Sequence, residues 1–154
     1  MATINTITGR VLEAYLNAFE HAHSAIDIIS VGQHYPRQQS LTLTIVDMGI
    51  GIPATVRRYL QDPTLSGANA MEWACQMGNT SQAGHMPRGL GLALLGRLIR
   101  HHHGRLDLIS HDGMAMFTPT SFITRSLPWK FPGTVAVITL QHVPQPSETE
   151  ENDV

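Results

Sequence analysis

The sequence predicts an α+β domain, a two-layer sandwich in which helices cover one face of a mixed sheet. Residues 10–25 and 89–103 have the apolar spacing of amphipathic helices. Several short runs rich in β-branched residues predict strands, and few positions allow them to alternate with helices as βαβ units. A chain of 154 residues is long enough for one domain with its own core. We expect that domain at residues 1–143 and a disordered, acidic tail at 144–154.

The first helix, at residues 10–25, carries Glu13 and Asn17 on one face, because residues four apart lie one turn apart. After it we expect, in order, a strand at 26–31, a long hairpin loop at 32–40, a strand at 41–46, and short helices at 54–60 and 65–77. The second strand ends at Asp47, and two glycines follow at a spacing of two. An acid beside bare backbone predicts a place that holds a flat, polar ligand.

The second half of the chain begins with a segment, residues 78–88, that is poor in apolar residues and is expected to be a mobile surface loop. Residues 54–87 as a whole form a long, weakly structured excursion of the kind that serves as a lid or binding loop. The helix at 89–103 ends at Gly104, a common C-terminal signal. Next we expect a strand at 106–110, a turn at 111–113, a strand at 114–117, an irregular segment at 118–131 and a strand at 134–140.

The composition excludes several classes of function. Charged residues make up 14% of the chain, against roughly 25% in an average domain, and the net charge is −2. We therefore expect neither nucleic acid nor a membrane as a partner. The single cysteine, Cys75, allows no intrachain disulfide and is interpreted as a buried hydrophobe. No signal peptide or long apolar run is visible, so a cytoplasmic location is expected.

Three interpretations of the motifs fail or are weak. A P-loop is rejected because the only lysine, Lys130, has no Gly-x4-Gly-Lys frame. Gly49-x-Gly51-x-x-Ala54 matches a loose dinucleotide fingerprint, but no good second strand follows before Gly89. The three histidines at 101–103 are adjacent on a helix, so their side chains diverge and cannot converge on one metal ion.

Four motifs taken together lead further. They are Glu13-x-x-x-Asn17 on a helix, Asp47-x-Gly49-x-Gly51 after a strand, Arg88-Gly89-Leu90-Gly91-Leu92 opening a helix, and Gly133-Thr134 starting the last strand. In order, spacing and structural context they resemble the histidine-kinase-like ATPase superfamily over about residues 10–140. The resemblance implies the ATP-binding sandwich of that superfamily, the Bergerat-type fold, with ATP and Mg²⁺ as ligands.

The resemblance also implies roles for individual residues. Asn17 would bind Mg²⁺ through its amide oxygen, and Glu13 would orient or deprotonate the attacking nucleophile. Asp47 would accept a hydrogen bond from the adenine amino group, while Gly49 and Gly51 let the backbone approach the purine.

At the phosphate end, a helix N-terminus would present its N–H groups to the phosphates. Its residues are Gly89, Leu90, Gly91 and Leu92. The remaining nucleotide-binding residues implied are Arg88, Thr80 and Ser81 at the phosphates and Thr134 at the adenine pocket. One departure is Pro87, where members of the superfamily often have glycine; proline removes an N–H donor and stiffens the lid.

The chain is most similar to the stand-alone, anti-sigma-factor type of serine/threonine kinase. We therefore expect a kinase or ATPase that acts in trans on a separate regulatory protein. Two alternatives stay open: a nucleotide-gated binding module with negligible turnover, and the catalytic domain of a larger sensor histidine kinase. The sequence leaves homodimer formation undecided.

Overall fold

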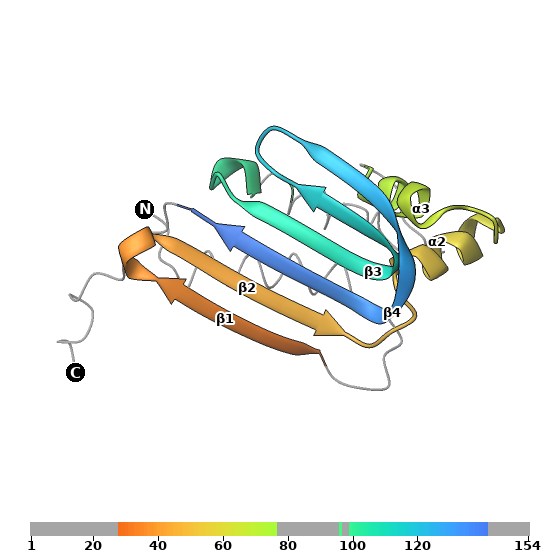
Figure 1. The fold of residues 1–154 in the computed structure, drawn as a ribbon, viewed down its shortest axis with the longest axis horizontal. Helices are drawn as coiled ribbons and strands as arrows, with labels where there is room; N and C mark the ends of the chain where they lie inside the picture. The colour runs from red at the N-terminus through yellow and green to blue at the C-terminus, as the bar shows by residue number, and fades with distance from the viewer. Residues whose placement is uncertain (1–27, 77–95, 97–98, 142–154) are drawn as a thin grey trace, which may run out of the picture.

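A computed structural model of the chain describes residues 28–76, 96 and 99–141. Within these residues lies one sheet of four strands in the order β1-β2-β4-β3. Its strands are β1 (Ile29–Tyr35), β2 (Ser40–Asp47), β3 (Arg105–Phe117) and β4 (Phe122–Leu140). Helices α2 (Ile52–Leu60) and α3 (Gly67–Cys75) follow β2, and Figure 1 shows them beside the end of the sheet at which β2 finishes. The predicted α+β class is confirmed, and both short helices lie where the sequence placed them.

The pairing of the strands differs in one respect from the mixed sheet that was predicted. In the described part of the chain, β1 with β2, β2 with β4, and β4 with β3 are all antiparallel pairs. Strands that run in the same direction are not neighbours: β4 separates β2 from β3, and β2 separates β1 from β4. Because β4 is the return strand of a hairpin with β3 and also pairs with β2, every neighbour in this part of the sheet is antiparallel.

The first hairpin is tighter than predicted. The expected loop at 32–40 is replaced by a longer strand, because Gly32, Gln33 and His34 pair with residues 41–43 of β2. A single turn of 3₁₀ helix, η1 (Pro36–Gln38), connects the strands, and Gln39 closes it with a φ of 48°. Pairing with a well-formed neighbour outweighs the weak strand propensity of Gly32.

The last two strands, β3 and β4, form a second hairpin, and both are longer than predicted, because residues 118–131 were expected to be irregular and β4 begins at Phe122. The predicted turn at 111–113 is a bulged bend inside β3, with register shifts between Ser110, His111 and Gly113. Figure 1 shows both strands bending here, so that the outer part of the hairpin runs back along the sheet. Pro128 and Pro132 fall where β4 has no partner residue on β3, so their missing N–H groups break no ladder.

The core lies on one face of the sheet and follows the alternation of the strands. On β2, Leu41, Leu43 and Ile45 point inward, and on β3 and β4 the same rows contain Leu106, Leu108, Ala136, Ile138 and Leu140. Met71 of α3, Ile99, Ala115 and Phe117 pack in the same cluster. Each fully buried Leu or Ile contributes about 1.5–3 kcal/mol, so these rows hold the strands in a single register.

Candidate functional site

Three polar residues occupy the next position in the inward-facing pattern, where the apolar rows end. Asp47 on β2 is the register partner of Thr134 on β4, and Thr134 is the partner of Ser110 on β3. All three are buried, with exposures of 0%, 1% and 0% for Asp47, Thr134 and Ser110. A polar row in core positions costs free energy unless each group has a partner, so its partners decide what the site can do.

Among the residues that the structure describes, only one of the two Asp47 carboxylate oxygens has a hydrogen-bond partner. The backbone N–H of Gly49 donates to Oδ1 over 2.8 Å, which turns the chain sharply after the strand. Oδ2 is buried and has no hydrogen-bond partner among the described residues. Burial raises the pKa of this carboxyl, while the Gly49 N–H and the Thr134 hydroxyl act in the opposite direction. The free oxygen is therefore an acceptor to which a ligand N–H group can donate.

Two glycines bring backbone close to this carboxylate. Gly133 has a φ of 115°, and a Cβ there would overlap the Asp47 carbonyl oxygen and lie 2.7 Å from the Met48 Cα. Gly51 has a φ of 82°, and a Cβ there would lie 3.2 Å from the Gly133 carbonyl oxygen. Side chains rarely adopt these angles, so the two turns can pack this closely only as glycines.

Ser110 joins the two turns to the polar row. Its Oγ accepts from the Ile52 N–H over 2.7 Å, donates to the Gly133 carbonyl oxygen over 3.1 Å, and lies 2.8 Å from Thr134 Oγ1. Helix α2 has no side-chain cap of its own at Gly51, so the hydroxyl from β3 satisfies its first N–H instead. Sequence reasoning missed Ser110; the available signal was a serine continuing the inward alternation after Leu106 and Leu108.

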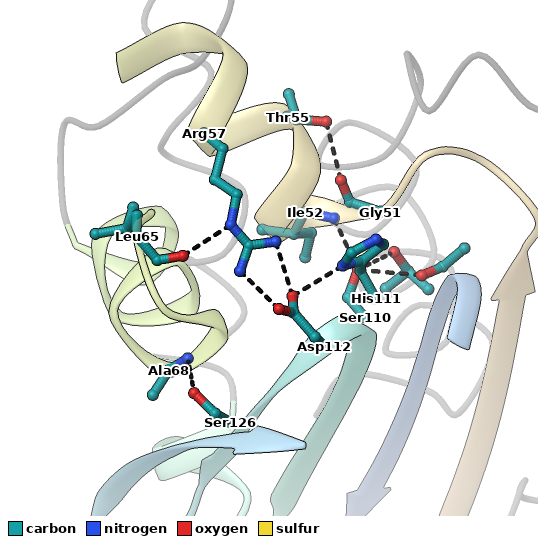
Figure 2. Close-up of polar contacts among 12 residues, drawn as sticks. Gly51, Ile52, Thr55, Arg57, Leu65, Ala68, Ser110, His111, Asp112 and Ser126 are labelled. Atoms are coloured by element: carbon teal, nitrogen blue, oxygen red, sulfur yellow. Dashed lines mark hydrogen bonds and ion pairs between the residues drawn. The ribbon is translucent and has the colours of Figure 1, made fainter. Parts of the chain in front are cut away.

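A charged cluster fixes α2 to the bulge of β3, directly after Ser110 (Figure 2). Arg57 donates from both terminal nitrogens to Asp112, over 2.9 and 2.7 Å, and from Nε to the Leu65 carbonyl oxygen over 2.8 Å. His111 Nδ1 lies 2.8 Å from the same carboxylate. Burial acts to raise the pKa of Asp112, but the hydrogen bonds from Arg57 and His111 and the charge of Arg57 lower it to about 2. The cluster therefore fastens the helices to the strand that carries Ser110.

The structure thus brings together part of the predicted site. Asp47, Gly51 and Thr134 meet at one end of the sheet, and Gly49 bonds to the carboxylate of Asp47. The other predicted residues lie outside the described residues: Glu13, Asn17, Thr80, Ser81, Arg88, Gly89, Leu90, Gly91 and Leu92.

The described residues also bear on whether the chain has a metal site, a reactive thiol or a membrane-spanning helix. Across residues 28–76, 96 and 99–141, no cluster of three or more His, Cys, Asp or Glu side chains has the arrangement of a metal site. Burial raises the pKa of Cys75 to about 12, so the thiol is a poor nucleophile. No helix in these residues is long and apolar enough to cross a membrane.

Comparison with protein families gives a match over most of the chain. The family model described as "Histidine kinase-, DNA gyrase B-, and HSP90-like ATPase" matches residues 6–143. The matched region includes every predicted site residue from Glu13 to Thr134. A comparison with curated proteins found no match.

Proposed function

The chain belongs to the histidine kinase-, DNA gyrase B- and HSP90-like ATPase family, and we propose that it binds Mg-ATP with the adenine at Asp47 and uses it as a protein kinase or ATPase acting in trans. The family consists of ATP-binding domains, so an ATP site is the starting point. The proposal adds which residues hold the nucleotide and which molecule accepts the phosphoryl group.

The observation that carries the proposal is the free Oδ2 of Asp47. A buried acceptor without a partner costs about 1–3 kcal/mol, and a ligand that donates to it recovers that free energy. The adenine amino group is such a donor, whereas guanine has a carbonyl oxygen at the same position and would be repelled. The described residues therefore fit adenine, and we expect ATP and ADP to be preferred over GTP and GDP.

Gly51, Gly133 and Thr134 support the same placement. The two glycines keep side chains away from the turns beside the carboxylate, so a planar ring can approach the backbone. Thr134 adds a hydroxyl to the same row. We propose that these residues form the floor of the adenine pocket.

At the phosphate end the proposal rests on the sequence. Asn17 offers the oxygen ligand that Mg²⁺ prefers, and the bound ion would neutralise charge on the phosphate oxygens. Gly89, Gly91 and Arg88, with Leu90 and Leu92, are proposed to hold the phosphates, with Thr80 and Ser81 as further contacts. Glu13 is proposed to orient or deprotonate the nucleophile, which is a hydroxyl of a separate regulatory protein or a water molecule.

Pro87 favours a second candidate function. It lies directly before Arg88 and offers no N–H to a phosphate, which would weaken the proposed phosphate end and leave the proposed adenine end unchanged. A nucleotide-gated binding module, which holds ATP and responds to it without appreciable turnover, would need only the adenine end and magnesium. The catalytic domain of a larger sensor kinase is the remaining alternative.

Turnover separates these functions. Purified protein with Mg-ATP should release phosphate or transfer labelled phosphate to a protein captured with it. Glu13→Ala should keep ADP affinity within about twofold and lose at least about 100-fold in turnover, within the usual range for a general base. Glu72→Ala, an exposed glutamate on α3, is the matched control and should leave turnover unchanged. Tight binding of ATP by the wild type, with neither phosphate release nor labelling, would contradict the kinase and support the binding module.

A further inference from the structure

Ser110 is a buried group in the polar row to which the family resemblance gives no role. Its hydroxyl has one hydrogen to donate and two lone pairs to accept with, and three partners surround it. Every contact is used when the Ile52 N–H and the Thr134 hydroxyl both donate to Ser110 and Ser110 donates to the Gly133 carbonyl oxygen. In this arrangement the hydroxyl hydrogen of Thr134 points at Ser110 Oγ.

The direction of the Thr134 hydrogen matters because Asp47 Oδ2 is nearby and free. Thr134 is the register partner of Asp47, and its hydroxyl is within reach of that carboxylate; a hydrogen bond donated there, instead of to Ser110, would lower the pKa of the carboxyl. A Thr134 hydroxyl without Ser110 as its partner would donate to the buried free acceptor beside it. Asp47 Oδ2, the proposed acceptor for the adenine amino group, would then already accept a hydrogen bond from Thr134.

We propose that Ser110 is a positioning residue for the nucleotide: it holds the Thr134 hydroxyl and so keeps Asp47 Oδ2 free for the adenine amino group. This inference rests on the proposed adenine site. It assigns the selectivity for the amino group to three strands acting together, with Ser110 acting through Thr134 rather than touching the base. The same hydroxyl accepts from the Ile52 N–H (Figure 2). It also donates to the Gly133 carbonyl oxygen, so the turns on both sides of the proposed adenine site depend on it.

The test compares two nucleotides that differ at one position of the base. ADP has the amino group, and inosine diphosphate has a carbonyl oxygen in its place, with identical ribose and phosphates. Calorimetric titration with Mg²⁺ gives the ratio of the two affinities, which does not depend on the fraction of protein that is folded. Wild type should prefer ADP at least about tenfold. Ser110→Ala should reduce that preference at least about threefold, and Ser110→Thr, which retains a hydroxyl, should restore it.

Two controls separate positioning from general damage. Ser126→Ala also removes a hydroxyl that accepts a helix N–H, from Ala68 over 3.0 Å, but on the outer part of the hairpin, and it should leave the ratio unchanged. In a Thr134→Val background the competing hydroxyl is absent, so adding Ser110→Ala should no longer change the ratio. If Ser110→Ala does not fold, Ser110→Cys provides the same comparison, because a thiol is a weak hydrogen-bonding group of similar shape.

The outcomes distinguish this inference from the function on which it rests. A wild type that binds neither nucleotide, or binds both equally, would overturn the adenine site and the role of Ser110 with it. A wild type that prefers ADP, with Ser110→Ala showing the same preference within about twofold, would overturn the role of Ser110 alone. An equal effect of Ser110→Ala with and without the Thr134→Val substitution would also overturn it, because Ser110 would then not act through the Thr134 hydroxyl.

Discussion

Gly133 lies against the backbone of Asp47, so closely that a Cβ at this position would overlap the Asp47 carbonyl oxygen. Its φ of 115° is also one that residues with side chains rarely adopt. The contact joins β4 to the end of β2, at the point on β4 where its buried residues begin. It therefore fixes how the turn after Asp47 sits over the polar row.

Gly133→Ala should consequently destabilise the fold. Backbone strain at a disfavoured φ and the overlap with Asp47 together should lower the free energy of unfolding by about 3 kcal/mol. Gly32→Ala is the control, because Gly32 is exposed on β1 and a Cβ there makes ordinary contact, 3.5 Å from Leu43 Cδ1. It should change stability by less than about 0.5 kcal/mol. Urea denaturation of both variants measures the difference; equal stabilities would contradict the close packing of Gly133.

The Arg57–Asp112 pair should make stability depend on pH in the acid range. The pKa of Asp112 is lowered from 3.8 to about 2, so the carboxylate stabilises the fold by about 2 kcal/mol at neutral pH. Because the folded-state pKa lies below the unfolded value, this contribution is complete above about pH 5 and is lost as the pH falls toward about 2. Asp112→Asn should therefore lower the free energy of unfolding at neutral pH, and the loss relative to wild type should be smaller at about pH 3.

The control for that variant is Asp107→Asn. Asp107 also pairs with an arginine, over 2.7 Å, but Arg105 is largely exposed, with 54% of its side chain accessible. Exposed pairs contribute little, so this variant should resemble wild type at both pH values. A loss in Asp112→Asn that stays constant from neutral to acid pH would mean that its effect is not due to the carboxylate charge.

The sequence identified the parts of the fold and site that depend on local patterns. Alternation located β2 and the last part of β4. Asp47 was singled out because it ends a strand and two glycines follow it, and Thr134 because the Gly133-Thr134 pair is one of the four motifs that carry the family resemblance. Ser110 was missed because a serine in a strand has meaning only once the register with Thr134 is known. The Arg57–Asp112 pair joins residues 55 apart in the chain, and no local pattern relates them. The irregular appearance of residues 118–131 hid a strand for the same reason, since its pairing with β3 is not a local property.

Asp47→Asn should leave the fold at least as stable as wild type at neutral pH. Burial raises the pKa of Asp47, so the fold favours the neutral form and is destabilised as the pH rises above the unfolded-state pKa. An asparagine is neutral and can still accept from the Gly49 N–H. Thermal unfolding at neutral pH measures this, and a clear loss of stability would mean that the ionised carboxylate supports the fold rather than serving a ligand.

The most direct test of the central claim is the affinity of this same variant for ADP with Mg²⁺, measured by calorimetry beside wild type and Asp107→Asn. An amide in place of the carboxylate presents an N–H group to the adenine amino group, so a donor faces a donor. We expect ADP affinity to fall at least about tenfold in Asp47→Asn and to stay within about twofold of wild type in Asp107→Asn. Binding of ADP by a folded Asp47→Asn variant at wild-type strength would contradict the adenine site at Asp47.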